Sequence, residues 1–139
     1  MRLTATLSFS ILLLATVCAR AEEGAATDCE NPMTQADMNI CAALSAGEAD
    51  KALNVQYRKT RAAAAAFDQQ MGADAAVSAV ATLTAAQKAW IPYRDATCEI
   101  QRALSGGGSI EPTLVAGCLE TETQKRTGEL KELETQFSQ

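Results

Sequence analysis

The sequence predicts an all-α fold, an antiparallel three-helix bundle stapled by two disulfides at one end. Alanine is abundant and runs of β-branched residues are absent, a composition that favours helices over strands. Two breaks, at Gly72 and at residues 105–109, divide the chain into three long segments. Because both connections are short, neighbouring helices should run antiparallel, and no internal repeat or linker indicates a second domain.

Residues 1–21 have the pattern of an export signal, so we expect a mature domain of residues 22–139. A positive start is followed by an apolar run over residues 7–17 and an A-x-A cleavage pattern at residues 19–21. The run is too short to span a membrane, and no later stretch resembles a span. The sequence therefore predicts a periplasmic or secreted protein without membrane insertion. Lipid anchoring at Cys18 is the less favoured alternative, because Val17 is bulkier than the residue that such processing needs.

Cleavage after residue 21 makes the chain more acidic. The full chain has 12 basic and 17 acidic residues, and loss of Arg2 and Arg20 leaves 10 basic residues and a formal charge of −7. This charge disfavours nucleic acids and anionic membranes as partners. It permits binding to a basic protein.

The mature chain retains an even number of cysteines, which in an exported domain indicates two disulfides. The four are Cys29, Cys41, Cys98 and Cys118. Three pairings remain possible, and we favour Cys29–Cys41 with Cys98–Cys118 because both are local. All four should lie at the end that holds the second break, which leaves the Gly72 end to packing alone. A metal site is the rival interpretation, but the chain has no histidine and no C-x-x-C pair.

The first helix is expected from about residue 34 to residue 70. Thr34 can cap it, and Asp37 lies near its positive end. Gly72 should stop it. Gly47 should weaken or bend it, since glycine inside a helix costs about 1 kcal/mol relative to alanine.

The second helix should be capped by Asp74 and continue to about Leu104. Pro92 must kink this helix or split it at Ile91, since proline lacks the amide hydrogen and clashes with the preceding turn. Residues 105–109 then break the chain. Pro112 fits the first turn of the third helix, which should continue to about residue 137.

Heptad spacing traces a mainly apolar inner face on each expected helix, with charged or amide residues near the single tryptophan, Trp90. This face includes Leu53 and Met71 in the first helix, Leu83 in the second and Leu130 in the third. Counted from the cysteines at about 1.5 Å per residue, Asp50, Trp90 and Arg126 lie at one height, roughly 12–14 Å from the stapled end. We expect Asp50 to pair with Arg126 beside Trp90, because a buried charge needs a partner. The expected interior polar network comprises Asp50, Asn54, Gln87, Trp90, Arg94 and Arg126. We interpret it as fixing helix register, with a functional site as the alternative. Trp90 and Tyr93 are expected to fill the core, with binding of an aromatic or sugar ligand as the alternative.

The sequence does not favour catalysis. Without histidine, the usual general base and the Ser-His and Cys-His nucleophile pairs are absent. The cysteines are expected to be oxidised, and no pair of carboxylates stands out from the others. We therefore predict that the protein is not an enzyme and that it has no catalytic, cofactor or metal site.

The second break contains a triple glycine that lacks the lysine and the preceding strand of a phosphate-binding loop. Loops on a rigid scaffold often carry binding, so this one is a candidate for contact with a partner, with a plain helix–helix turn as the alternative. The candidate loop comprises Gly106, Gly107, Gly108, Ser109 and Ile110.

Three blocks of the chain resemble the LprI-type lysozyme-inhibitor family. The first contains Cys29, Thr34-Gln35-Ala36-Asp37-Met38-Asn39, Cys41-Ala42, Ala49-Asp50, Leu53-Asn54 and Tyr57. The second contains Gln87, Ala89-Trp90, Tyr93-Arg94-Asp95 and Cys98, and the third Gly107-Gly108-Ser109-Ile110, Cys118-Leu119, Thr123, Arg126 and Leu130. Pro92 and Gly47 depart from the smooth helices of the family pattern. The shared residues look like scaffold, so the resemblance assigns no inhibitory residue.

The resemblance implies a small exported bacterial helical domain that inhibits lysozyme by protein–protein binding. Charge is compatible with this expectation, because animal lysozymes are basic and would attract a partner of charge −7. The alternative function is an envelope interaction or stress-tolerance module that binds another protein or a cell-wall fragment, without catalysis.

Overall fold

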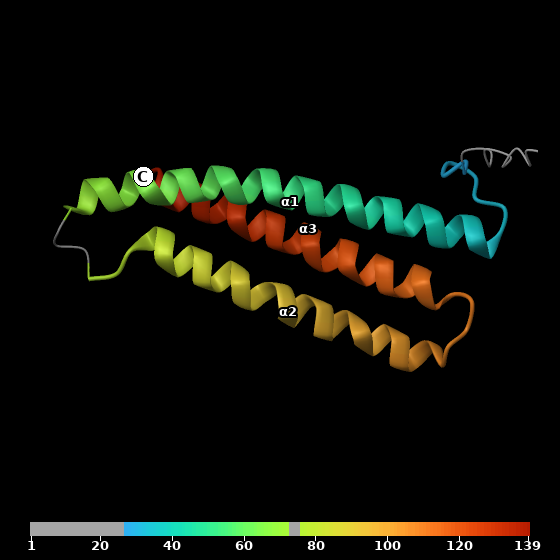
Figure 1. Ribbon diagram of the computed structural model, residues 1–139. Coiled ribbons are helices and arrows are strands. Elements are labelled where there is room, and N and C mark those ends of the chain that lie inside the picture. The colour runs from blue at the N-terminus through green and yellow to red at the C-terminus, as the bar shows by residue number, and fades with distance from the viewer. Residues whose placement is uncertain (1–26, 73–75) are drawn as a thin grey trace, which may run out of the picture.

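The computed structural model describes residues 27–72 and 76–139, which form three helices and confirm the predicted all-α bundle. The helices are α1 (Gln35–Met71), α2 (Ala79–Ser105) and α3 (Glu111–Phe137). They run antiparallel in chain order, and α3 packs most extensively against α1 (Figure 1). The predicted export signal, its cleavage site and Cys18 lie outside the described residues. None of the helices in the described part of the chain combines the length and apolar character needed to cross a membrane.

The ends of α1 agree with the prediction. Thr34 and Asp37 form a reciprocal capping box: the Thr34 hydroxyl oxygen accepts from the Asp37 amide at 3.1 Å, and the Asp37 carboxylate accepts from the Thr34 amide at 3.0 Å. Gly72, with φ of 63°, ends the helix. Gly47 lies inside a continuous 37-residue helix, so it does not interrupt α1.

The start of α2 differs from the prediction. The expected cap, Asp74, lies outside the described residues, and the observed N-cap is Ser78, whose side chain accepts from the Ala81 amide at 3.1 Å. A carboxylate of α1, that of Asp68, also accepts hydrogen bonds from the first amides of α2, those of Ala79 and Val80. This cap comes from another helix, so local sequence does not reveal it.

Of the two alternatives predicted at Pro92, a kink or a split at Ile91, the split is wrong, because α2 continues through Pro92 to Ser105. Proline removes the hydrogen bond that would reach the carbonyl of Lys88. Both Lys88 and Pro92 are exposed, so water can reach this side of the helix. The predicted break after α2 is present, and Gly106 and Gly107 adopt the positive φ values, 64° and 83°, that favour glycine.

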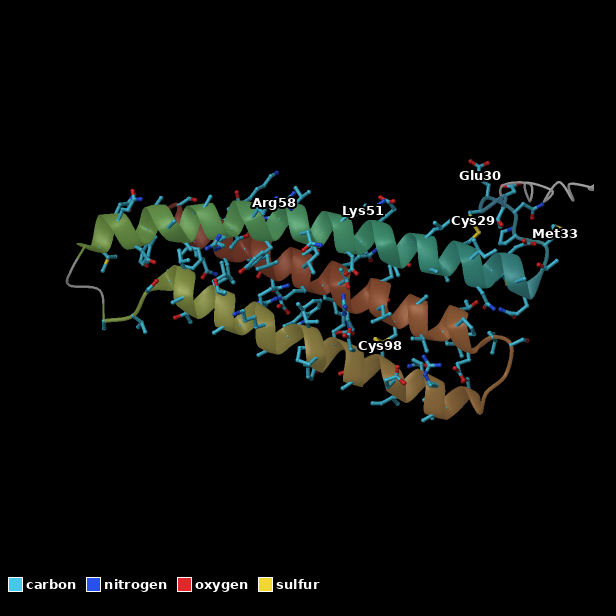
Figure 2. The ribbon with its side chains drawn as sticks, viewed as in Figure 1. Cys29, Glu30, Met33, Lys51, Arg58 and Cys98 are labelled. Carbon is cyan, nitrogen blue, oxygen red and sulfur yellow. A yellow bond between two sulfur atoms is a disulfide. The ribbon has the colours of Figure 1, made fainter. Side chains whose placement is uncertain are left out.

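Two disulfides join residues close in sequence, in the pairing that the sequence favoured. Cys29 bonds to Cys41 across 12 positions, and Cys98 bonds to Cys118 across 20 positions. The first ties the N-terminal segment to α1, and the second joins α2 to α3. Both lie in the half of the bundle that holds the connection from α2 to α3, which we call the disulfide end (Figure 2).

The core is narrow and contains many small residues. Its apolar centre comprises Leu53, Ala64, Leu83 and Leu130, with Tyr57, Trp90 and Phe137 packed against it. Thr60 is fully buried and donates its hydroxyl to the Leu130 carbonyl at 2.8 Å, which ties α1 to α3. Small side chains at a helix contact let the two backbones approach closely.

Candidate functional site

The interior polar network is built around Arg94 rather than Arg126. The Arg94 guanidinium lies 2.7 Å from the Asp50 carboxylate of α1, donates to the buried Thr123 hydroxyl of α3 at 3.1 Å, and pairs with Asp95 at 2.9 Å. It also lies 5.1 Å from the centre of the Trp90 ring, a cation–π geometry. One side chain of α2 thus bonds to both other helices.

Arg126 belongs to a separate cluster. Its Nε donates to the Gln87 side-chain oxygen at 3.1 Å, and its Nη1 pairs with Glu129 at 2.8 Å. The predicted Asp50–Arg126 pair is therefore wrong. Counting along helices estimates the height of a residue, but it does not fix the direction in which a side chain points around the helix axis. Asn54 is exposed, and it lines a hollow between α1 and α2 together with Asp50, Trp90 and Arg94.

All five residues of the candidate partner-binding loop, 106–110, are exposed at the disulfide end, and we call them the glycine loop. Its exposed backbone is nevertheless tied to the first turns of α1. The Asn39 amide donates to the Ser109 carbonyl at 3.1 Å, and the Thr113 hydroxyl donates to the Asn39 side-chain oxygen at 2.6 Å. The Gln35 amide donates to Thr113 at 3.1 Å. Asn39 thus bonds to the loop directly, and Gln35 bonds to Thr113 just after it. Both residues belong to the first of the three sequence blocks that carry the family resemblance.

A second set of contacts closes the base of the glycine loop. Arg102 of α2 forms an ion pair with Glu111 of α3, and the Ser105 hydroxyl lies 3.3 Å from the same carboxylate. Glu99, and then Glu111, raise the pKa of Arg102 above its ordinary value, so this guanidinium stays charged. The backbone of the loop is therefore held in place, while the side chains of the loop are exposed to solvent.

The surface around the glycine loop combines carboxylates with exposed apolar side chains. Within residues 27–44 and 99–114, the carboxylates are those of Asp28, Glu30, Asp37, Glu99 and Glu111, and the one cation is Arg102. Figure 2 shows Glu30 and the 78% exposed Met33 projecting beside the first turn of α1. Ile110 of the loop itself is an exposed apolar residue, and the nearest others along the helices are Ile100, Leu104 and Leu114. Such a mixture suits contact with a basic protein.

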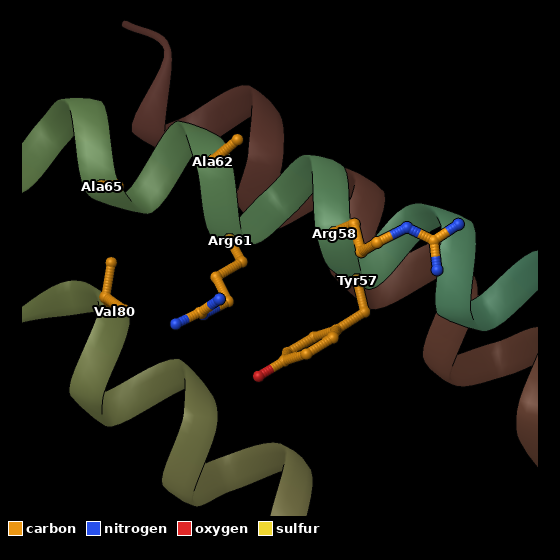
Figure 3. Close-up of a pocket in the computed structure, with 6 residues that line it drawn as sticks. All are labelled: Tyr57, Arg58, Arg61, Ala62, Ala65 and Val80. Atoms are coloured by element: carbon orange, nitrogen blue, oxygen red, sulfur yellow. The ribbon is translucent and has the colours of Figure 1, made fainter.

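Sequence reasoning missed a groove between α1 and α2. Two adjoining hollows share Tyr57 as a lining residue. One of them extends to Val80 and the other extends to Arg94. In Figure 3, Tyr57 and Arg61 project from α1 into the space beside α2, and Arg58 lies along the rim. A sequence signal existed: residues 51–67 and 75–94 contain six cations and no carboxylate, in a chain that is acidic as a whole.

Across residues 27–72 and 76–139, no three carboxylates or cysteines are arranged to hold a metal ion.

Comparison with known proteins identifies relatives. The family model described as "Lysozyme inhibitor LprI" matches residues 26–130. An uncharacterized protein of Rhizobium meliloti (strain 1021) is 46% identical over 128 residues, which cover 91% of each chain. No solved structure gives a significant match.

Proposed function

Because the chain belongs to the LprI lysozyme-inhibitor family, we propose that it inhibits a lysozyme by protein–protein binding after export from the cell. Two disulfides support export, because such bonds form and persist in oxidising compartments. Inhibition by binding needs no catalytic group in the inhibitor. It needs a surface that fits the enzyme and keeps its shape.

The observation that carries the proposal is that the glycine loop is exposed and held at the same time. Asn39 holds its backbone from α1, and the Arg102–Glu111 pair closes its base. A projection that is already ordered loses little conformational freedom when it binds, so more of its contact energy contributes to affinity. We assign the inhibitory contact to this loop.

Charge decides which part of the disulfide end enters the cleft of the enzyme. A lysozyme cleft contains two catalytic carboxyl groups, so carboxylates of the inhibitor would be repelled there. The glycine loop has no charged residue and can enter. The surrounding carboxylates, among them Glu30 and Asp37, would meet the basic rim and steer the encounter.

The test compares two variants in an assay of peptidoglycan lysis by a c-type lysozyme. Ile110→Glu introduces a carboxylate on the glycine loop and should reduce inhibition by at least about tenfold, since like charges in a contact cost several kcal/mol. Val77→Glu is the matched control, because Val77 is exposed and lies at the opposite end of the bundle. Equal inhibition by the two variants would contradict the assignment of the loop.

A further inference from the structure

We propose that the groove between α1 and α2 is a second binding site, for a saccharide chain that bears carboxylates. We call it the α1–α2 groove and define it by residues 50–65 of α1 and 80–94 of α2. Its two hollows have volumes of about 360 and 370 Å³, within the range of ligand sites. Sixteen helical residues span roughly 22 Å, so the groove suits an extended chain rather than a compact molecule.

Cationic side chains line the groove, and this indicates an anionic ligand. Arg58 and Arg61 line the hollow nearer Val80, and Lys88 lines the one nearer Trp90. Within the described residues, none of the three forms an ion pair, whereas Arg94, Arg102 and Arg126 all do. Unpaired cations that line one groove, in a chain with more acidic than basic residues, form a local positive surface.

The carboxylates nearest the groove are already engaged. At one end, Asp50 accepts from Arg94 at 2.7 Å. Beyond the other end, Asp68 accepts from Ser78 and from the first amides of α2. Neither therefore neutralises Arg61 or Lys88 in the structure, so both cations are available to a ligand.

The other lining residues favour a saccharide as the bearer of the negative charge. Tyr57 and Trp90 offer aromatic surface, which suits the apolar faces of sugar rings. The same hollow is lined by the Thr84 hydroxyl and by the side-chain amides of Asn54 and Gln87. Thr84 donates to the Val80 carbonyl and the Gln87 oxygen accepts from Arg126, which leaves the Asn54 amide and the Gln87 nitrogen to bond with sugar hydroxyl and acetamido groups. Alternating amino sugars with carboxylate substituents, the chemistry of bacterial cell-wall glycan, supply all three features.

This site goes beyond the proposed function, because it lies on a different surface from the glycine loop. The groove opens between α1 and α2, whereas the loop projects from the disulfide end. The two can therefore be occupied together. A domain that holds cell-wall glycan would be concentrated where lysozyme cuts that glycan, which raises the effective concentration of the inhibitor.

The test uses the intrinsic fluorescence of Trp90, the single tryptophan, which lines the groove. The probe is a tetrasaccharide of alternating N-acetylglucosamine and N-acetylmuramic acid, with calorimetry as a second readout. We expect saturable binding that weakens by at least about tenfold for a neutral N-acetylglucosamine tetramer, since charge-assisted hydrogen bonds are lost. Absence of binding in both readouts, or equal binding of the neutral tetramer, would overturn the proposal. So would tighter binding of an oligonucleotide, which would assign the groove to general polyanions.

Variants locate the site. Arg61→Ala combined with Lys88→Ala removes one groove cation from each helix and should weaken binding of the acidic tetrasaccharide by at least about tenfold. Lys125→Ala combined with Lys131→Ala removes two cations from α3 and should leave binding unchanged. An equal loss in both double variants would contradict a specific groove. Lysozyme inhibition should survive loss of the groove cations, so this proposal and the proposed function can fail separately.

Discussion

The Asp68 carboxylate, near the end of α1, accepts a 2.7 Å hydrogen bond from the hydroxyl of Ser78, the N-cap of α2. It also accepts from the amide of Ala79 at 2.7 Å and from that of Val80 at 3.2 Å. At the end of the bundle without disulfides, α1 and α2 are thus joined by a hydrogen-bonded helix cap to which both contribute. Packing contributes as well, since the rings of Phe67 and Phe137 lie 5.7 Å apart. The expectation that packing alone holds this end is therefore wrong.

Acid should weaken this cap. The Ser78 hydroxyl, and then the Ala79 amide, lower the pKa of Asp68 below 3.8, while partial burial opposes them. A carboxylate whose pKa is lower in the folded state stabilises the fold above its unfolded pKa, and this contribution is lost as pH falls towards the folded pKa. Asp68→Asn should therefore lower the melting temperature by a few degrees at neutral pH. The difference from the unmodified protein should shrink below about pH 4.

Thermal unfolding of both proteins, followed by circular dichroism between neutral pH and about pH 3, measures the difference. Glu132→Gln serves as the control, since Glu132 is an exposed carboxylate of α3. A difference that stays constant over this range would contradict the role given to the ionised Asp68.

Double-mutant cycles should distinguish the observed ion pair from the one that helix counting predicts. Asp50 and Arg94 lie in direct contact, so they should show a coupling of roughly 0.5–3 kcal/mol in unfolding free energy. Asp50 and Arg126 belong to separate clusters and should show none beyond about 0.5 kcal/mol. The variants are Asp50→Ala, Arg94→Met and Arg126→Met, measured by urea unfolding. A larger coupling of Asp50 with Arg126 than with Arg94 would contradict the network described above.

The two disulfides should differ in their contribution to stability. Cys98–Cys118 closes the longer loop, and Cys98 is fully buried, whereas Cys29 is exposed. Replacement of both members of a pair by serine should cost about 2–4 kcal/mol, and the buried pair should cost more because polar hydroxyls then enter the core. Urea unfolding of the two double variants decides this. Equal losses would indicate that burial of Cys98 adds nothing beyond loop closure.

The sequence was sufficient for the parts of the fold that depend on local chemistry. Thr34 with Asp37, the triple glycine and Pro112 mark helix boundaries through hydrogen bonding and backbone freedom alone. Heptad spacing placed Leu53, Leu83 and Leu130 in the core. Met71 was expected on the same inner face but is exposed, and it is the last residue of α1.

The sequence was not sufficient where tertiary contact decides. The cap of α2 depends on Asp68, which is ten residues away from Ser78, so no local pattern reveals it. Asp50 pairs with Arg94 and not with Arg126, because the direction in which each side chain points around its helix depends on how the helices pack. The α1–α2 groove left a signal in the acid-free stretches 51–67 and 75–94. The sequence alone does not show that these two stretches face each other, and only that arrangement makes a positively charged groove.

The central claim is tested most directly by titrating the oxidised mature protein into peptidoglycan lysis by a c-type lysozyme, at low and at moderate salt. We predict saturable inhibition that weakens as salt rises, because exposed charges are screened beyond a Debye length of about 8–10 Å. Reduction of the disulfides should lower inhibition by loosening the disulfide end. No inhibition of any of several lysozyme classes, with the oxidised protein folded, would contradict the proposed function.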